Sequence, residues 1–462
     1  MAVEVGKPLT RDAVIVIPGI MGSTLVDTES GETLWGLNKA GWWVHAWTTG
    51  SSLARLTVTE DERAGTVGRI RAVGLLRFPA FAPILQGFEP YTDLVAGITR
   101  VVADREAVCE FPYDWRLSIE HNAGELAKVA AEHLRGWRTH PQGSADAKVV
   151  LVAHSMGGLI ARYFTHVLGD AGDVRTTVTL GAPYYGAVKA AHILASGRGT
   201  PLPLPHRRLR RLCATMPGLH DLLPFYRCLD EETTARRLTA ADVAGLGGDL
   251  DLATKSIARH EQLMSGPPGD LRLLVGVEQP TMQSMSVANG VLTPLMHTCH
   301  VDDQGRVVSR EDLAGDSTVF RRAAAGFGLS PSTLPQSHGA LAATEEAISH
   351  VRDVLTNDTA GPPLGALTRI GVNVPDVICI DQPLTITISG AGPVGASCRI
   401  VDVFTNHQVA RPPLQRRDGV TFAAADLPRP GVYRVEVKGG GASAVTQQVM
   451  AIPPQAQLSE DD

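Results

Sequence analysis

One serine is the strongest candidate for chemistry in this sequence. Residues 153–158 read Ala-His-Ser-Met-Gly-Gly and begin where the apolar run 148–153, KVVLVA, ends. A serine hydroxyl is a poor nucleophile unless it is exposed and a base removes its proton. A sharp strand-to-helix turn exposes such a serine, and its strain requires small neighbours, here Ala153 and Gly157. The pattern predicts that Ser155 is a catalytic nucleophile; the alternative is an ordinary serine-glycine turn before a helix.

A nucleophilic serine that attacks an ester also needs donors for the oxyanion that develops. The N–H of Met156 would lie at the N-terminus of the helix that follows Ser155, where the helix dipole favours negative charge. A second donor is expected from an earlier loop, and residues 18–23, PGIMGS, follow the first apolar run. We predict the N–H of Met21 for this position. An ordinary glycine-rich turn is the alternative for this loop.

An acid and a base must follow the serine, in the order Ser, Asp, His. Asp316 lies in the turn AGDSTVF, and His338 lies in LPQSHGAL, directly before a helical pattern. We predict that His338 takes the proton of Ser155 and that Asp316 fixes the tautomer of the imidazole. Because neighbours at a sharp turn point in different directions, His154 is predicted to be structural. The weaker candidates are Asp302, Asp303, Asp312, His297, His300 and His350.

The elements that would position these residues alternate between strands and helices. Short apolar runs suited to strands covered on both faces occupy residues 14–17, 148–153, 176–180 and 271–277. Helical periodicity follows Ser155 and recurs in residues 123–137 and 340–355. This alternation predicts an α/β fold with a mostly parallel central sheet.

The pattern changes near residue 357. Residues 357–366, NDTAGPPLGA, read as a linker, and from residue 367 to about 452 only short alternating runs separated by turn residues occur. This is typical of a small antiparallel sandwich, immunoglobulin-like in size. We therefore predict a larger unit over 1–360, an all-β sandwich over 365–455 and a disordered acidic tail over 456–462.

Composition narrows the class of protein further. The chain of 462 residues is 44% hydrophobic and carries a formal charge of −6, which argues against a nucleic-acid binder held by phosphate contacts. No stretch reaches the roughly 20 apolar residues of a spanning helix, and the N-terminus lacks signal-peptide features. These features predict a cytoplasmic protein and leave peripheral membrane contact open. The six cysteines are scattered without a CxxC pair, so we predict neither a disulfide framework nor a metal site, and no cofactor.

Seven motifs in a fixed order carry a family resemblance. They are VIVIPGIMGSTL, FPYDWRLS, AHSMGG, LGAPYYGAVKA, MPGLHDLLP, GDSTV and SHGAL. Together they resemble the lecithin:cholesterol acyltransferase and lysosomal phospholipase A2-like family of α/β-hydrolases, over about residues 12–350. The resemblance implies an α/β-hydrolase with cap or lid insertions at about 35–90 and 190–270.

The same resemblance implies roles for single residues. Ser155 would be the nucleophile, Asp316 the acid and His338 the base, with Met21 and Met156 as oxyanion donors. Asp114 and Arg116, in the family stretch YDWR, are expected to act as structural supports. The implied reaction is lipid acyl-ester hydrolysis or acyl transfer through an acyl-enzyme, on glycerophospholipids as a phospholipase of the A type. Water or an alcohol could be the acceptor.

The family also implies a membrane-facing region between the first strand and YDWR. This region holds Trp35, Trp42, Trp43 and Trp47, and we predict that Trp42, Trp43 and Trp47 contact lipid. A cap packed on the core is an equal alternative. The basic run 206–211, HRRLRR, could meet lipid phosphates or could be a solvated face.

Two other functions remain open from the sequence. A lipase for neutral lipids, or an esterase for small esters, would use the same nucleophile and would be favoured if the tryptophan-rich segment packs inward. The other alternative is a partner-binding scaffold, in which the C-terminal sandwich recruits a protein.

Overall fold

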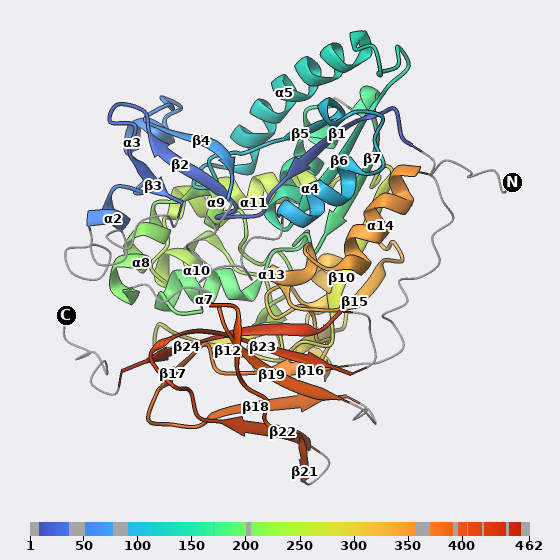
Figure 1. Cartoon of the computed structure of the whole chain (residues 1–462). Helices are drawn as coiled ribbons and strands as arrows, with labels where there is room; N and C mark the ends of the chain where they lie inside the picture. Colours follow the sequence, from blue (N-terminus) through green and yellow to red (C-terminus); the bar gives the residue numbers. More distant parts are fainter. Residues whose placement is uncertain are drawn as a thin grey trace, which may run out of the picture.

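A mostly buried parallel sheet forms the centre of the larger part of the molecule (Figure 1). The computed structural model describes residues 9–36, 51–76, 91–169, 171–199, 205–356, 370–390, 396–403, 405–417, 420–439 and 443–453. The strand order is β15-β10-β7-β6-β1-β5, and each neighbouring pair is parallel. The strands are β1 (Ala13–Ile17), β5 (Val108–Glu110), β6 (Val149–His154), β7 (Val174–Leu180), β10 (Leu271–Val277) and β15 (Ser332–Pro335).

The sheet forms here because its central strands are apolar on both faces. Every residue of β1 and β6 is buried, as expected for strands that helices cover on both sides. The long helix α5 (Ile119–Thr139) begins at Ser118, whose side chain accepts a hydrogen bond from the N–H of His121. The predicted helix 123–137 lies within α5. Two more helices that accompany the sheet are α4 (Tyr91–Thr99) and α6 (Met156–Arg162).

The helix predicted for residues 340–355 is divided in the structure. A short helix α13 (His338–Leu341) is followed by a break and then by α14 (Glu345–Thr356). The break has a local cause, because the hydroxyl of Thr344 accepts a hydrogen bond from the N–H of Ala347 and so caps a new helix. The prediction of one continuous helix was wrong.

Additional elements that are not part of the central sheet lie in and beside the segments predicted as insertions. The first segment contributes to an antiparallel sheet of order β3-β2-β4 and contains two short helices. These elements are β2 (Ser23–Asp27), β3 (Thr33–Trp35), β4 (Ile70–Leu75), α2 (Ser51–Ala54) and α3 (Glu60–Arg63). The second segment holds α7 (Val188–Ser196), α8 (His206–Ala214), α9 (Pro217–His220), α10 (Ala240–Gly245) and α11 (Leu250–Met264). The domain boundaries themselves stay predictions.

Small strands connect these helices to the end of the larger part. A four-stranded sheet has the order β12-β11-β8-β9, and β13 pairs with β14 as a hairpin. Their bounds are β8 (Leu229–Asp230), β9 (Ala235–Arg236), β11 (Ser284–Ala288), β12 (Val291–Leu295), β13 (Thr298–Val301) and β14 (Val307–Glu311), with α12 (Arg321–Ala324) following.

The C-terminal part consists of two sheets around a second hydrophobic core. The sheets have the orders β16-β18-β22-β21 and β17-β24-β23-β19-β20. Their strands are β16 (Gly371–Asn373), β17 (Val377–Cys379), β18 (Leu384–Ser389), β19 (Ser397–Asp402), β20 (His407–Ala410), β21 (Gln415–Arg417), β22 (Val420–Ala425), β23 (Gly431–Lys438) and β24 (Val445–Ile452). Within the described residues after 370 there is no helix, as the alternating runs predicted. The immunoglobulin-like assignment stays a prediction, and the linker 357–366 and the tail 456–462 lie outside the described residues.

Two properties of the described chain concern the membrane and the thiols. None of the helices that the structure describes is both long and apolar enough to cross a membrane. The six cysteines are present as free thiols.

Candidate active site

Ser155 lies between β6 and α6 in a strained backbone conformation. Its φ is 52° and its ψ is −125°, a combination that residues with a side chain rarely adopt. The turn is fixed by two backbone bonds, from the N–H of Ser155 to the carbonyl of Leu180 (3.0 Å) and from the N–H of Gly158 to the carbonyl of Ser155 (2.9 Å). The chain therefore turns at the carboxyl end of a buried parallel strand, the position of the nucleophile in α/β-hydrolases.

The glycines around this turn are required by close packing. A Cβ on Gly157 would lie 2.6 Å from the carbonyl oxygen of Pro18, and one on Gly158 would lie 2.4 Å from Cβ of Ala182. A Cβ on Gly19 would lie 2.9 Å from Cβ of Ser155 itself. Since such distances are below van der Waals contact, the turn tolerates no larger residue at these positions.

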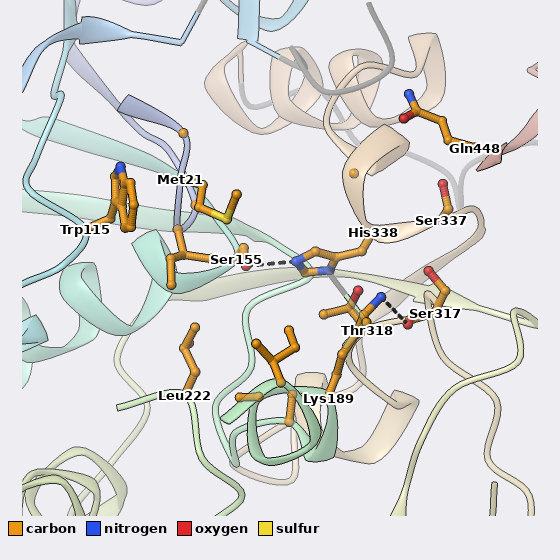
Figure 2. Close-up of a pocket in the computed structure, with 18 of the residues that line it drawn as sticks. Met21, Trp115, Ser155, Lys189, Leu222, Ser317, Thr318, Ser337, His338 and Gln448 are labelled. Atoms are coloured by element: carbon orange, nitrogen blue, oxygen red, sulfur yellow. Dashed lines mark hydrogen bonds between the residues drawn. The ribbon is translucent and has the colours of Figure 1, made fainter. Parts of the chain in front are cut away.

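Three of the predicted site residues lie in one chain of hydrogen bonds, of which Figure 2 shows the bond between His338 and Ser155. Nε2 of His338 is 2.8 Å from Oγ of Ser155, and Nδ1 of His338 is 2.7 Å from Oδ2 of Asp316. Asp316 is fully buried, and its Oδ1 accepts the backbone N–H groups of Thr318 (3.0 Å) and Val319 (2.7 Å). The N–H of His338 also donates to the carbonyl of Asp316 at 2.7 Å. Hydrogen bonds thus connect the three side chains in the order Asp316, His338, Ser155.

Four of the weaker candidates have other partners. Asp302 pairs with Arg306, and Oδ1 of Asp312 accepts the amide of Gln283. Nε2 of His300 lies 2.9 Å from Glu311. Of the rival histidines, His297 contacts Asp230 at 3.0 Å and His350 is buried in α14.

The loop predicted to supply an oxyanion donor lies beside Ser155. Met21 has a positive φ of 64° and lines the same cavity as Ser155. Aromatic side chains hold this loop: the indole N–H of Trp35 donates to the carbonyl of Met21 (3.0 Å), and the hydroxyl of Tyr113 donates to the carbonyl of Pro18 (3.0 Å). Among the described residues, no acceptor is found for the N–H of Met21 or of Met156. Both N–H groups are therefore available for an oxyanion.

His154 supports the site from behind. Its Nε2 lies 3.1 Å from the carbonyl oxygen of His338, and its Nδ1 lies 2.9 Å from the hydroxyl of Tyr91. Tyr91 also accepts the N–H of Gly19 at 2.8 Å. Burial, followed by the nearby imidazole of His338, lowers the pKa of His154 to about 3, so it stays neutral at physiological pH. This geometry agrees with the structural role predicted for His154.

The motif YDWR contains a fully buried arginine. Arg116 pairs with Asp114 (2.6 Å) and with Glu62 (2.9 Å), and its Nη1 donates to the carbonyl of Leu56 (3.2 Å). Burial alone would raise the pKa of Glu62, but hydrogen bonds from Arg116, the N–H of Thr59 and Arg69 outweigh burial and lower it to about 2. Arg116 thereby joins Glu62, in the first segment predicted as an insertion, to the YDWR segment, whose Tyr113 holds the loop of Met21.

Arg116→Met is expected to lower the free energy of unfolding by about 3–5 kcal/mol, because it leaves the buried carboxylate of Asp114 without its cation and leaves buried Glu62 with Arg69 alone. Denaturant unfolding followed by circular dichroism measures this change. The control is Lys128→Met, which removes an exposed ion pair with Glu125 and should change stability by less than about 1 kcal/mol. Equal effects of the two substitutions would contradict the supporting role of Arg116.

A mostly apolar cavity of about 310 Å³ opens onto Ser155 and His338. Its apolar lining comes from the two segments predicted as insertions and from the YDWR segment: Trp35, Leu53, Leu56, Trp115, Leu209, Leu212, Leu219 and Leu222. Such a lining suits an aliphatic chain attached to the group that Ser155 would attack.

Comparisons with known proteins match part of this chain to a family. Residues 71–243 match the family model of lecithin:cholesterol acyltransferase. Residues 71–243 belong to the lecithin:cholesterol acyltransferase family. The lysosomal phospholipase A and acyltransferase of Rattus norvegicus is 27% identical over 192 residues, which are 38% of this chain and 45% of that protein. The Homo sapiens protein of the same name is 34% identical over 96 residues, or 20% of this chain and 22% of that protein. The chain thus spans less than half the length of these curated relatives.

A solved structure gives a likeness of fold. The crystal structure of a Tle4–Tli4 complex aligns with 76% of this chain and 99% of its own, with a TM-score of 0.50 and 16% sequence identity. At this identity the likeness concerns the fold alone. The family assignment and the parallel sheet with Ser155 at the end of β6 agree on an α/β-hydrolase.

The lipid-facing residues expected from the family resemblance are only partly described. Trp42, Trp43 and Trp47 lie outside the described residues, so their contact with lipid stays a prediction. Trp35 is 2% exposed and packs edge-to-face on Trp115, with ring centroids 5.5 Å apart, so this member of the tryptophan group is core. In α8, Leu209 faces the cavity while the arginines at 207, 210 and 211 are exposed. Their contact with lipid phosphates also stays a prediction.

One group of side chains could hold a metal ion, which the sequence analysis did not anticipate. Ligand atoms of Asp230, His297 and Cys299 all lie within 4.8 Å of one another. Arg310 donates to both carboxylate oxygens of Asp230 at 2.7 Å. The acid of the group is therefore already neutralised by a guanidinium, which disfavours a cation there.

Several cavity residues were not predicted from the sequence. Lys189 on α7 donates to the carbonyl of Ser317 (3.3 Å) beside Asp316, and burial lowers the pKa of its amine. The sequence does contain a signal for Lys189, because it follows closely after GAPYYG, within one of the family motifs. Arg434 and Gln448, from the C-terminal strands, also line the cavity, and no signal in the sequence placed them there.

Proposed function

We propose that this chain is a serine-dependent lipid acyl-ester hydrolase or acyltransferase that acts on glycerophospholipids as a phospholipase of the A type. The observation that carries the proposal is the hydrogen-bonded chain from Asp316 through His338 to Ser155, at the wall of a mostly apolar cavity. Family membership supports a lipid ester as the substrate, since curated relatives are named phospholipase A and acyltransferase.

The first half of the proposed reaction forms an acyl-enzyme. Oγ of Ser155 attacks the ester carbonyl carbon while Nε2 of His338 takes its proton. The tetrahedral oxyanion accepts hydrogen bonds from the N–H groups of Met21 and Met156. His338 then returns the proton to the leaving alkoxide, which departs as the lysophospholipid alcohol and leaves the acyl group on Ser155.

The second half releases the acyl group to an acceptor. Water or an alcohol donates its proton to His338 and attacks the acyl carbon, and the same oxyanion donors stabilise the second tetrahedral species. Collapse of that species breaks the bond to Ser155, whose oxygen regains a proton from His338. Water gives a fatty acid and an alcohol gives a new ester, so both activities follow from one site.

Buried, preformed contacts prepare this chemistry before a substrate binds. Asp316 keeps the proton of His338 on Nδ1, which leaves Nε2 as the acceptor for Ser155. The apolar residues of α8 and of the segment 217–222 offer a surface for the acyl chain. A neutral-lipid lipase or small-ester esterase would share these features, so the substrate decides between the proposals.

The experiment compares three substrates with the same enzyme preparation. We expect fatty acid release from phosphatidylcholine vesicles to exceed release from trioleoylglycerol emulsions, and an added long-chain alcohol to accumulate as its ester. A short p-nitrophenyl ester reports the chemistry alone. Turnover of the short ester without any release from phosphatidylcholine would support the alternative of a small-ester esterase, and no turnover of any substrate would contradict the proposed enzyme.

A further inference from the structure

The cavity beside Ser155 has a wall that comes from the far end of the chain. Residues of β23 and β24 line the same cavity as Ser155 and His338. In Figure 2, Gln448 of β24 lies beyond Ser337 on the side of His338 away from Ser155. The active site is therefore bounded by both parts of the molecule.

Strand alternation explains why this wall is polar. In a strand, alternate side chains face opposite sides of the sheet. Tyr433, Val435, Val445 and Val449 are buried in the core of the C-terminal part. The intervening residues of the two strands lie on the other face of the sheet and line the cavity: Val432, Arg434, Thr446, Gln448 and Met450. The face that is free of the second core thus becomes a wall of the active site.

Two buried glutamines fix this wall in place. Gln336 lies two residues before His338 in the chain. Its side-chain amide donates to the carbonyl of Ala444 (2.9 Å) and accepts the N–H of Thr446 (3.2 Å). The amide of Gln279 donates to the carbonyl of Ile370 (2.9 Å) and accepts the N–H of Val372 (3.0 Å). Each glutamine thus binds a backbone donor and acceptor of the C-terminal part as another strand would.

Gln279 is also attached to the segment of the acid. Its own N–H donates to the carbonyl of Gly315 at 2.8 Å, directly before Asp316. The wall is therefore held against both loops that carry the acid and the base, and its position relative to Ser155 is defined.

One polar side chain in this wall has no partner. Both Nε2 and Oε1 of Gln448 are buried, and neither forms a hydrogen bond with any described residue. A buried amide without partners is costly, so its donor and acceptor are suited to a bound group. Gln448 is paired across the strands with Arg434, a cation that also lines the cavity and is held by Glu436 at 2.7 Å.

The charges around the cavity indicate the kind of group. Lys189 and Arg434 contribute positive charge to the lining, and Asp376 contributes negative charge. A phosphate ester accepts hydrogen bonds and carries the charge that these two cations favour. The amide N–H of a glutamine can donate to an oxygen of this phosphate.

We propose that the C-terminal strands complete the substrate site and that Gln448 binds the phosphate-bearing headgroup of the lipid ester. This inference rests on the proposed function. The acyl chain then lies along the leucine-rich wall of α8 while the headgroup faces β23 and β24. The C-terminal part acts as a specificity element of the enzyme, whether or not it also recruits the protein partner predicted from its sequence.

The test uses the full chain and two soluble substrates. Gln448→Leu removes the donor and the acceptor at nearly constant size, and we expect the KM for dihexanoyl phosphatidylcholine to rise roughly tenfold. The kinetic constants for p-nitrophenyl butyrate, which has no headgroup, should stay within twofold. The matched control is Gln408→Leu, at an exposed position of β20, which should leave the kinetic constants for both substrates unchanged.

A second variant guards against a loss of folding in the first. Gln448→Glu keeps the size of the side chain and places a negative charge beside the headgroup, so its KM for the phospholipid should rise more than that of Gln448→Leu. An unchanged KM for phosphatidylcholine in a folded variant would overturn the inference. Equal losses on both substrates would overturn it as well, since they indicate a purely structural role. Either result leaves the proposed function standing if Ser155 is still required for turnover of both substrates.

Discussion

Ser155→Ala is expected to lower the turnover of phosphatidylcholine and of a short p-nitrophenyl ester by about 10⁴-fold or more. The substitution removes the oxygen that would form the acyl-enzyme, while the oxyanion donors and the cavity remain. Loss on both substrates is expected because they would share the chemical step and differ only in binding. Initial rates at saturating substrate, compared with wild type, measure the effect.

Covalent labelling tests independently whether Ser155 is the nucleophile. A fluorophosphonate probe should label the wild-type chain at one serine, because only an activated hydroxyl displaces the fluoride at an appreciable rate. Ser155→Ala should abolish the labelling, and Ser309→Ala, at an exposed position of β14, should leave it unchanged. Labelling that persists in Ser155→Ala would show that another nucleophile reacts.

The sequence allowed the elements around Ser155 to be predicted because their signals are local. The buried strands β1 and β6 are uninterrupted apolar runs, and the glycines after Ser155 mark a turn that the packing requires. Asp316 and His338 could be selected because Asp316 lies in a glycine-led turn before a short apolar run and His338 lies in a loop directly before a helical pattern, in the order that the fold demands. Their hydrogen-bonded geometry agrees with that selection.

Signals that depend on tertiary contact were missed or misread. The periodicity of residues 340–355 predicted one helix, but the helix is interrupted, and the hydroxyl of Thr344 caps its second part. Periodicity reports which residues share a face and is insensitive to one capping bond. Trp35 was grouped with the other tryptophans of its segment, although its indole N–H is used to hold the loop of Met21.

The polar wall of the cavity shows what strand alternation in a sequence cannot predict. Alternation in β23 and β24 identifies the two faces of these strands, but it does not say what lies against the second face. Gln279 and Gln336 are isolated glutamines in loops, and only the fold shows that each binds backbone of the C-terminal part. The C-terminal strands, whose sequence is typical of an independent domain, thus line the cavity beside Ser155.

Asp316→Asn is expected to lower kcat by about 10⁴-fold with little change in KM. The buried carboxylate accepts three hydrogen bonds, two from the backbone N–H groups of Thr318 and Val319 at Oδ1 and one from His338 at Oδ2. An asparagine can keep the two backbone bonds only through its single oxygen, and its amide N–H₂ then faces Nδ1 of His338. Because that amide is a donor, Nδ1 must lose its proton, and the proton moves to Nε2.

An imidazole protonated on Nε2 cannot accept the proton of Ser155, so the loss arises from the wrong tautomer rather than from a missing charge alone. The ¹⁵N shifts of His338 in the variant report the tautomer directly, and thermal melting checks that the fold is kept. Asp303→Asn, at an exposed position among the rival acids, is the matched control and should retain wild-type kcat. A buried acceptor that sets the tautomer cannot be replaced by a donor without stopping proton transfer. A decrease in kcat smaller than about 100-fold in Asp316→Asn, or an equal decrease in Asp303→Asn, would therefore mean that Asp316 does not orient the base.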